Sequence, residues 1–184
     1  VQTVRPLEVA PRQWEEKALA KALNESLPVV FGGLAIMVGV LAVGHALVME
    51  GLPMKVMVAL SATTSFAYAI AWAVIRFARP VPLGSTHAAA ATIAAMLAAN
   101  SLVHIGVTGD IIHSTNVALL IVSVGCFFTA LPWFAGTVTV ILFGWTQVVS
   151  NLVNGGDWVH YGFMNFIAVM LSYLVFRART RLIV

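Results

Sequence analysis

Histidine is the residue type in this chain with the clearest capacity for chemistry, and four of the five histidines fall at the same end of the expected helices. These are His45, His104, His113 and His160, and Asp110 belongs to the same layer. Neutral imidazole is a common ligand of zinc, copper and haem iron, and helix bundles assemble such sites from different helices. A haem b would take His45 or His104 with His160, whereas zinc or copper would take three or four of the group. No spacing matches a local metal motif, so a protonation-sensitive cluster and plain hydrogen bonding are the alternatives.

Polar residues at helical spacing extend this layer into an expected pocket. Polar groups in hydrocarbon must find partners, so they usually face the interior of a bundle. Most of these residues lie in the outer halves of their helices, which predicts a polar cavity that opens away from the cytoplasm. The alternative is a set of interhelical hydrogen bonds that only holds the bundle together. The expected pocket residues are Asn100, Thr108, Thr115, Asn116, Gln147, Asn151, Tyr161 and Asn165, with Ser61, Ser65, Tyr68 and Asn154 in similar stripes.

The elements that must position these side chains are expected to be membrane-spanning helices. Between Glu25 and Arg177 the chain has six charged residues, namely Glu50, Lys55, Arg76, Arg79, Asp110 and Asp157. Most of the apolar intervals between them suit one helix of about 20 residues, the length that crosses a hydrocarbon core. The interval 111–156 is too long for one helix, and Leu131-Pro132-Trp133 near its middle predicts a turn. We therefore expect an all-α polytopic membrane protein with a bundle of six transmembrane helices, at about 28–49, 54–76, 87–106, 115–131, 134–153 and 158–177.

The charges and the composition support the same class of protein. A mean hydropathy of +0.95 and 9% charged residues exclude a soluble globular domain and a disordered chain. Lys and Arg are retained on the cytoplasmic side, and in the six-helix arrangement only Lys55 falls on the opposite side. Both termini are therefore expected in the cytoplasm. The net charge of +3 needs no nucleic acid to explain it, because these cations lie where anionic lipid headgroups attract them.

The chain is expected to divide into three segments. Residues 1–26 form a cytoplasmic amphipathic segment, which either lies at the membrane surface with Trp14 at headgroup depth or packs against a cytoplasmic partner. Residues 27–177 form the six-helix transmembrane domain. Residues 178–184 begin a cytoplasmic signalling helix or tail, because no proline or glycine after Gly162 interrupts the helical pattern.

Arginines dominate the end of the last expected helix. Arg177, Arg179 and Arg181 alternate with other residues there. They serve either as a positive-inside anchor or as a relay for a signal, and the two roles are compatible.

A run of polar motifs punctuates the apolar sequence of residues 80–134. The motifs are Thr86-His87, Asn100-Ser101, His104, Thr108-Gly109-Asp110 and Thr115-Asn116. In this pattern the segment resembles the central part of bacterial six-helix membrane-associated sensor domains, which precede histidine-kinase, PAS or diguanylate-cyclase modules. The resemblance implies an input module, in the bacterial inner (cytoplasmic) membrane, that detects a small or membrane-dissolved signal. It also implies a cytoplasmic output domain, such as a histidine kinase or diguanylate cyclase, which these 184 residues do not contain.

Two functional hypotheses follow, and a structural membrane subunit with no ligand is a third alternative. The first is a homodimeric sensory module that relays a signal from the outer histidine pocket through the sixth helix. The second is a haem-, metal- or pigment-associated accessory subunit of a larger redox or photosynthetic assembly. An enzyme is not expected, because no phosphate-binding loop, hydrolase elbow or zinc-protease helix is found. His87, at the inner end of the third helix, is expected to cap that helix or to form a second, inner site.

Overall fold

The structure is a computed structural model that describes residues 12–152 and 157–183, and within these ranges every regular element is a helix. The main helices are α1 (Arg12–Val48), α2 (Gly51–Ala73), α3 (Thr86–Thr108), α4 (Ser114–Phe127), α5 (Leu131–Ser150) and α6 (Asp157–Ile183). Three short helical segments accompany them. The π-helix η1 (Val74–Ala78) continues α2, and the 3₁₀ turns η2 (Leu83–Ser85) and η3 (Ile111–His113) precede α3 and α4. Of the described helices, five are long and apolar enough to cross a membrane, and Ile111–Phe127 is a shorter apolar helix. The expectation of an all-α chain with several long apolar helices is confirmed.

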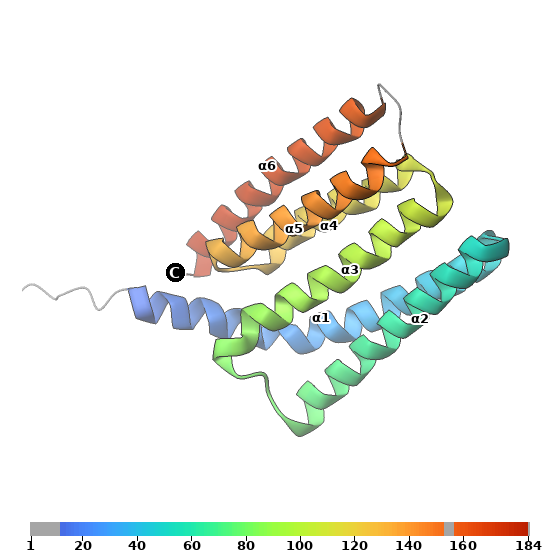
Figure 1. The fold of residues 1–184 in the computed structure, drawn as a ribbon. Coiled ribbons are helices and arrows are strands. Elements are labelled where there is room, and N and C mark those ends of the chain that lie inside the picture. The colour runs from blue at the N-terminus through green and yellow to red at the C-terminus, as the bar shows by residue number, and fades with distance from the viewer. Residues whose placement is uncertain (1–11, 153–156, 184) are drawn as a thin grey trace, which may run out of the picture.

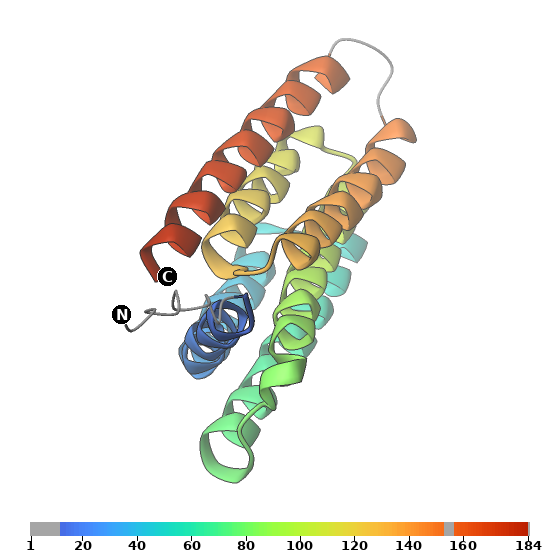
Figure 2. The same cartoon turned by 90° about the vertical axis from the view of Figure 1, so that its left-hand side faces the viewer.

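The helices form two packed groups that share α3 (Figure 1). Helices α1 and α2 form an antiparallel hairpin on one side of α3, and α4, α5 and α6 lie on the other side. Within the second group α4 lies between α5 and α6 (Figure 2). Because one helix separates α4 from α6 in the chain, α4 and α6 run in the same direction.

Glycine and proline set two of the turns. Gly51 begins α2 with a φ of +67°, a left-handed conformation that glycine adopts at little cost. Pro132 occupies the first turn of α5, where its missing N–H would have no helical partner in any case. The break expected at Leu131-Pro132-Trp133 is therefore present, although α4 already ends at Phe127.

Two apolar clusters hold the helices together. The larger joins α3, α4, α5 and α6, with Leu23 of α1, around fully buried residues such as Ile105 and Ile121. The smaller joins α1, α2 and α3 around Leu27 and Tyr68. Tyr68 also donates a hydrogen bond from its hydroxyl to the Ile93 carbonyl at 2.9 Å, so the polar tip of this core side chain is satisfied.

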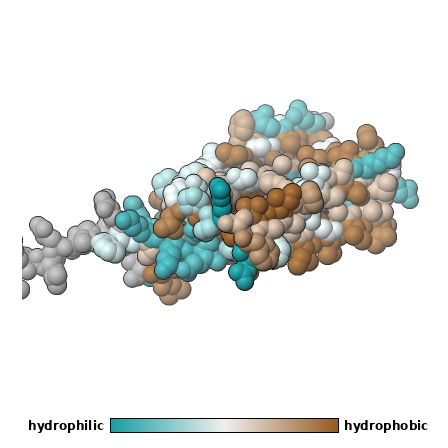
Figure 3. Space-filling model, turned by 90° about the horizontal axis from the view of Figure 1, so that it is seen from below, coloured by the Kyte–Doolittle hydropathy of each residue, from teal (hydrophilic) through white to brown (hydrophobic). Residues whose placement is uncertain are grey.

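Large apolar side chains cover the outside of the bundle as well as its core. Val29, Ile36, Phe66 and Phe143 are each more than 60% exposed. In the view of Figure 3 brown apolar residues occupy the middle of the molecule, and teal polar residues gather nearer its two ends. A helix that is apolar all round is typical of a membrane span.

The amino-terminal amphipathic segment is continuous with α1 over its described part, residues 12–26. It is tied to the rest of the bundle by two hydrogen bonds. The Asn24 side-chain amide donates to the Val81 carbonyl at 2.7 Å, and the Thr129 hydroxyl donates to the Leu19 carbonyl at 3.3 Å. This segment therefore packs on the loops at one end of the bundle.

Candidate functional site

Three of the expected histidines come together in the structure. The ring centroids of His45 on α1 and His104 on α3 are 5.1 Å apart, with the rings edge to face. Those of His104 and His113, in the turn before α4, are 3.9 Å apart with 22° between the ring planes. We call His45, His104 and His113 the histidine column. All three are half-buried, and the column joins two helices of the bundle to the start of a third.

A serine on α2 brings the fourth element into contact with the column. The Ser61 hydroxyl lies 3.3 Å from Nδ1 of His45 and 3.4 Å from the side-chain amide of Asn100. Ser61 is fully buried and Asn100 is 8% exposed. If Nδ1 of His45 carries no proton, Ser61 donates to it; if Nδ1 is protonated, the serine oxygen accepts. The protonation state of His45 is thus coupled to a buried hydrogen-bond network.

The turn between α3 and α4 sets the position of His113. Gly109 ends α3 with a φ of +67°, and the Thr108 hydroxyl oxygen accepts a hydrogen bond from the Asp110 amide at 3.3 Å. The Asp110 carboxylate in turn accepts from the Ile112 amide at 2.9 Å. This arrangement reverses the chain within a few residues, so that His113 returns over His104. Asp110 therefore holds the turn by hydrogen bonds to its backbone.

The column stacks its rings and does not converge on a point. Among residues 12–152 and 157–183, no group of three or more His, Cys, Asp or Glu side chains is arranged to hold a metal ion. Rings that lie face to face 3.9 Å apart also leave no space between them for a porphyrin. The arrangement brings three titratable rings into contact, and one of them, His45, also has a serine hydroxyl within hydrogen-bond distance.

His160 does not join the column. It lies on the exposed first turns of α6, where its ring packs edge to face against Tyr161 with centroids 5.1 Å apart. Tyr161 is half-buried. The pairing of His160 with His45 or His104 across a haem is therefore not formed in this structure.

The other expected pocket residues divide between interior and surface. Asn100 and Asn165 are buried, and Thr108 is half-buried with its hydroxyl donating to the His104 carbonyl at 2.7 Å. The residues on the outer surfaces of their helices are Thr115, Asn116, Gln147 and Asn151. Asn154 lies outside the described residues. These positions do not share one cavity, because the stripe on α5 faces away from the core.

Two further features lie away from the histidine column, and the first is His87, which was expected to cap α3 or to form a second site. The ring of His87 lies against Phe128 and Trp133, with centroid distances of 6.4 Å and 6.1 Å and nearly parallel planes. Its Nδ1 is buried and has no hydrogen-bond partner among the described residues. The Thr86 hydroxyl makes the local contact at the start of α3, a bond to the Pro82 carbonyl at 3.4 Å. His87 is thus mainly an aromatic packing residue in this structure. The sequence does not show this role, because Phe128 and Trp133 lie far from His87 along the chain.

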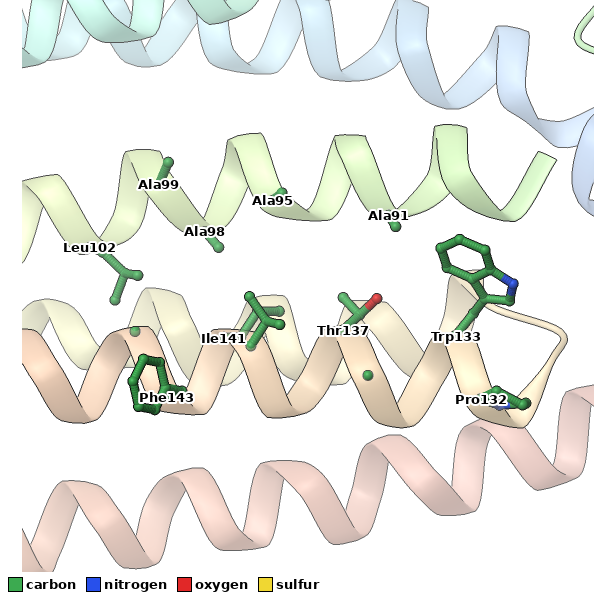
Figure 4. A pocket seen from close by; sticks show the side chains of 13 residues that line it. Ala91, Ala95, Ala98, Ala99, Leu102, Pro132, Trp133, Thr137, Ile141 and Phe143 are labelled. Carbon is green, nitrogen blue, oxygen red and sulfur yellow. The ribbon is translucent and has the colours of Figure 1, made fainter. Parts of the chain in front are cut away.

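The second is an apolar groove of about 580 Å³ between α3 and α5 (Figure 4). Alanines of α3 form one wall, and α5 forms the other from Trp133 at one end to Phe143 toward the other. Thr137 supplies the single side-chain hydroxyl in the lining. Such a surface offers almost no hydrogen bonds to a ligand, and it lies apart from the histidine column.

Comparison with protein-family models, curated proteins and solved structures finds no match for this chain.

Proposed function

We propose that the chain is a six-span membrane bundle with both ends in the cytoplasm. Its support is the set of long apolar helices together with the Ile111–Phe127 helix, which has the length of a short span. The apolar outer surface of the bundle fits hydrocarbon. Positive residues cluster at the ends of the spans that the charge rule assigns to the cytoplasm.

The proposed function of this bundle is sensory input for a cytoplasmic output domain. The observation that carries it is the histidine column, which joins α1, α3 and the start of α4 through titratable rings in mutual contact. Histidine changes charge near neutral pH. Two positive charges about 4 Å apart repel by about 4 kcal/mol at an effective dielectric constant of 20. A second proton on the column, or a ligand that contacts these rings, therefore changes the preferred distance between the helices that carry them.

The output of the module is proposed to act in a homodimer through a histidine kinase or diguanylate cyclase, in the bacterial inner membrane. The support for this part is the resemblance of residues 80–134 to membrane-associated sensor domains. The sixth helix extends through Arg177, Arg179 and Arg181 toward such a partner. Because the column favours stacking over a haem or a converging metal site, the accessory redox subunit finds no specific support in the geometry.

The experiment that tests this function measures helix movement in proteoliposomes. A Cys126→Ser background takes spin labels at Ile36 on α1 and Leu182 on α6, both exposed, and the distance between them is recorded at pH 8 and pH 5, with and without Zn²⁺. We expect a shift that His104→Ala abolishes and His160→Ala preserves. If neither protons nor Zn²⁺ alter the distance in the unsubstituted column, the input role of the column is wrong.

A further inference from the structure

Among the parallel helix pairs in the described residues, α4 and α6 have the most extensive contact. The Ser172 hydroxyl of α6 donates to the Ile121 carbonyl of α4 at 2.5 Å, and both residues are fully buried. A Cβ atom at Gly125 would overlap the Ser172 backbone carbonyl. Only glycine permits backbones to approach this closely, so the two helices meet main chain to main chain at this level.

A second link joins the same helices toward their cytoplasmic ends. The Arg179 guanidinium donates from Nη1 to the carbonyl of Cys126 and, at 2.7 Å, to that of Phe127. These carbonyls belong to the last turn of α4, where backbone acceptors have no partner within the helix. The negative end of the helix dipole also attracts a cation there. Arg179 thus donates hydrogen bonds to free carbonyl groups at the end of α4 and places a positive charge near the negative end of its helix dipole.

The neighbouring arginines make no such contact among the described residues. Arg177 and Arg181 are exposed, whereas Arg179 is half-buried against α4. Both bonds come from one nitrogen, Nη1, whose two N–H groups the planar guanidinium holds in fixed directions, whereas the lysine ammonium is a flexible point charge. Of the three arginines expected to relay a signal, one is therefore structurally distinct.

The other end of α4 touches the histidine column. His113 directly precedes Ser114, the first residue of α4, and the Ser114 hydroxyl accepts a hydrogen bond from the Trp145 indole at 2.8 Å. Helix α4 thus has a ring of the column at its start and the Arg179 guanidinium at its end. It therefore offers a continuous path between the column and the end of α6.

We propose that Arg179 is a positioning residue that locks the cytoplasmic end of α6 to α4, so that the two helices move as one body. A displacement of His113 then reaches the residues after Arg179 through α4, without bending of α6. This inference rests on the proposed function for its stimulus. The locking of α6 by Arg179 is a separate physical claim that needs no stimulus.

The test compares Arg179→Gln with Arg177→Gln, which remove the same charge from the same turn region of α6. In a Cys126→Ser background, which retains the Cys126 carbonyl, a spin label at Leu182 reports mobility, and a second label at exposed Leu119 on α4 gives the α4–α6 distance. We expect Arg179→Gln to broaden the distance distribution and to mobilise the label, with Arg177→Gln unchanged. Arg179→Lys, a milder variant, retains the charge and is expected to restore the lock only in part. The inference is wrong if the label mobility and the α4–α6 distance distribution of Arg179→Gln equal those of the Arg177→Gln control.

The response to protons separates this claim from the proposed function. With labels at Ile36 and Leu182, we expect the shift between pH 8 and pH 5 to be lost in Arg179→Gln and retained in Arg177→Gln. A full shift in Arg179→Gln overturns the coupling role and leaves the column as the input site. No shift in the parent protein, together with a loosened α6 in Arg179→Gln, contradicts the proposed function while the lock stands.

Discussion

The imidazole rings of His104 and His113 stack face to face with centroids 3.9 Å apart, although His104 lies on α3 and His113 lies in the turn after it. Stacking at this distance is compatible with two neutral rings or with one charged ring. Two charged rings at this distance repel each other. The pair is therefore a point at which proton binding and helix packing oppose each other.

Stability is expected to fall as the pH is lowered from 8 to 5. The folded column resists the second proton, whereas the unfolded chain accepts it, so the unfolded state binds more protons and stability increases with pH. Replacing His113 by Asn removes one ring, and the pH dependence of the melting temperature in detergent should become shallower. His160→Asn is the matched control, because His160 lies outside the column. An equal change in the pH dependence of both variants would show that the stack of His104 and His113 does not cause it.

The sequence predicted the helices well because their length and apolar character are local properties. The turn near Leu131-Pro132-Trp133 was found correctly, since Pro132 is compatible with the first turn of a helix and not with its middle. Most of the expected ranges coincide with observed helices to within a few residues. The clearest difference is α1, in which the expected amphipathic segment and the first expected span form one helix that continues through Pro28.

The faces of the helices were harder to predict. On a helix that is apolar all round, periodicity does not say which side meets lipid, so Gln147 and Asn151 were placed in an interior that they do not reach. His160 failed to join the column for the same reason. Ser61 was recognisable from its stripe with Ser65 and Tyr68, but its contact with His45 depends on how α1 and α2 pack. The contact of Arg179 with the end of α4 was also not predictable, because nothing in the sequence distinguishes Arg179 from Arg177 and Arg181.

Gly125 should tolerate no side chain. Gly125→Ala places a methyl group against the Ser172 carbonyl, and overpacking of this kind costs about 1–3 kcal/mol. Gly136→Ala is the control, because a Cβ at Gly136 meets nothing within 4 Å, and alanine favours a helix over glycine by up to about 1 kcal/mol. Unfolding in detergent should show that Gly125→Ala lowers the stability of the protein and that Gly136→Ala raises it. Similar effects at both positions would contradict the close approach of α4 and α6.

His87 is expected to be replaceable by phenylalanine. His87→Phe keeps a flat ring between Phe128 and Trp133 and removes a buried nitrogen that has no partner among the described residues. Stability should therefore be unchanged or raised by up to about 1 kcal/mol. His87→Ala loses both aromatic pairs, each worth about 0.5–1.5 kcal/mol, and should be clearly destabilised. If the Phe and Ala variants lose the same stability, the imidazole nitrogen has a polar role that stacking does not supply.

Replacement of Asn165 by an apolar residue is expected to stabilise the protein, which is unusual for a substitution at a buried position. The Asn165 side chain is 1% exposed on α6, and neither amide atom has a hydrogen-bond partner among the described residues. A buried polar group without a partner costs about 1–3 kcal/mol, so Asn165→Leu should stabilise the protein by a comparable amount, measured by unfolding in detergent. The control is Asn100→Leu, which breaks the link to Ser61 and should cost about 0.6 kcal/mol, the average for such bonds in membranes. A destabilised Asn165→Leu variant would mean that the amide binds a polar partner within the bundle, and Asn165 would then join the histidine column as a second polar centre.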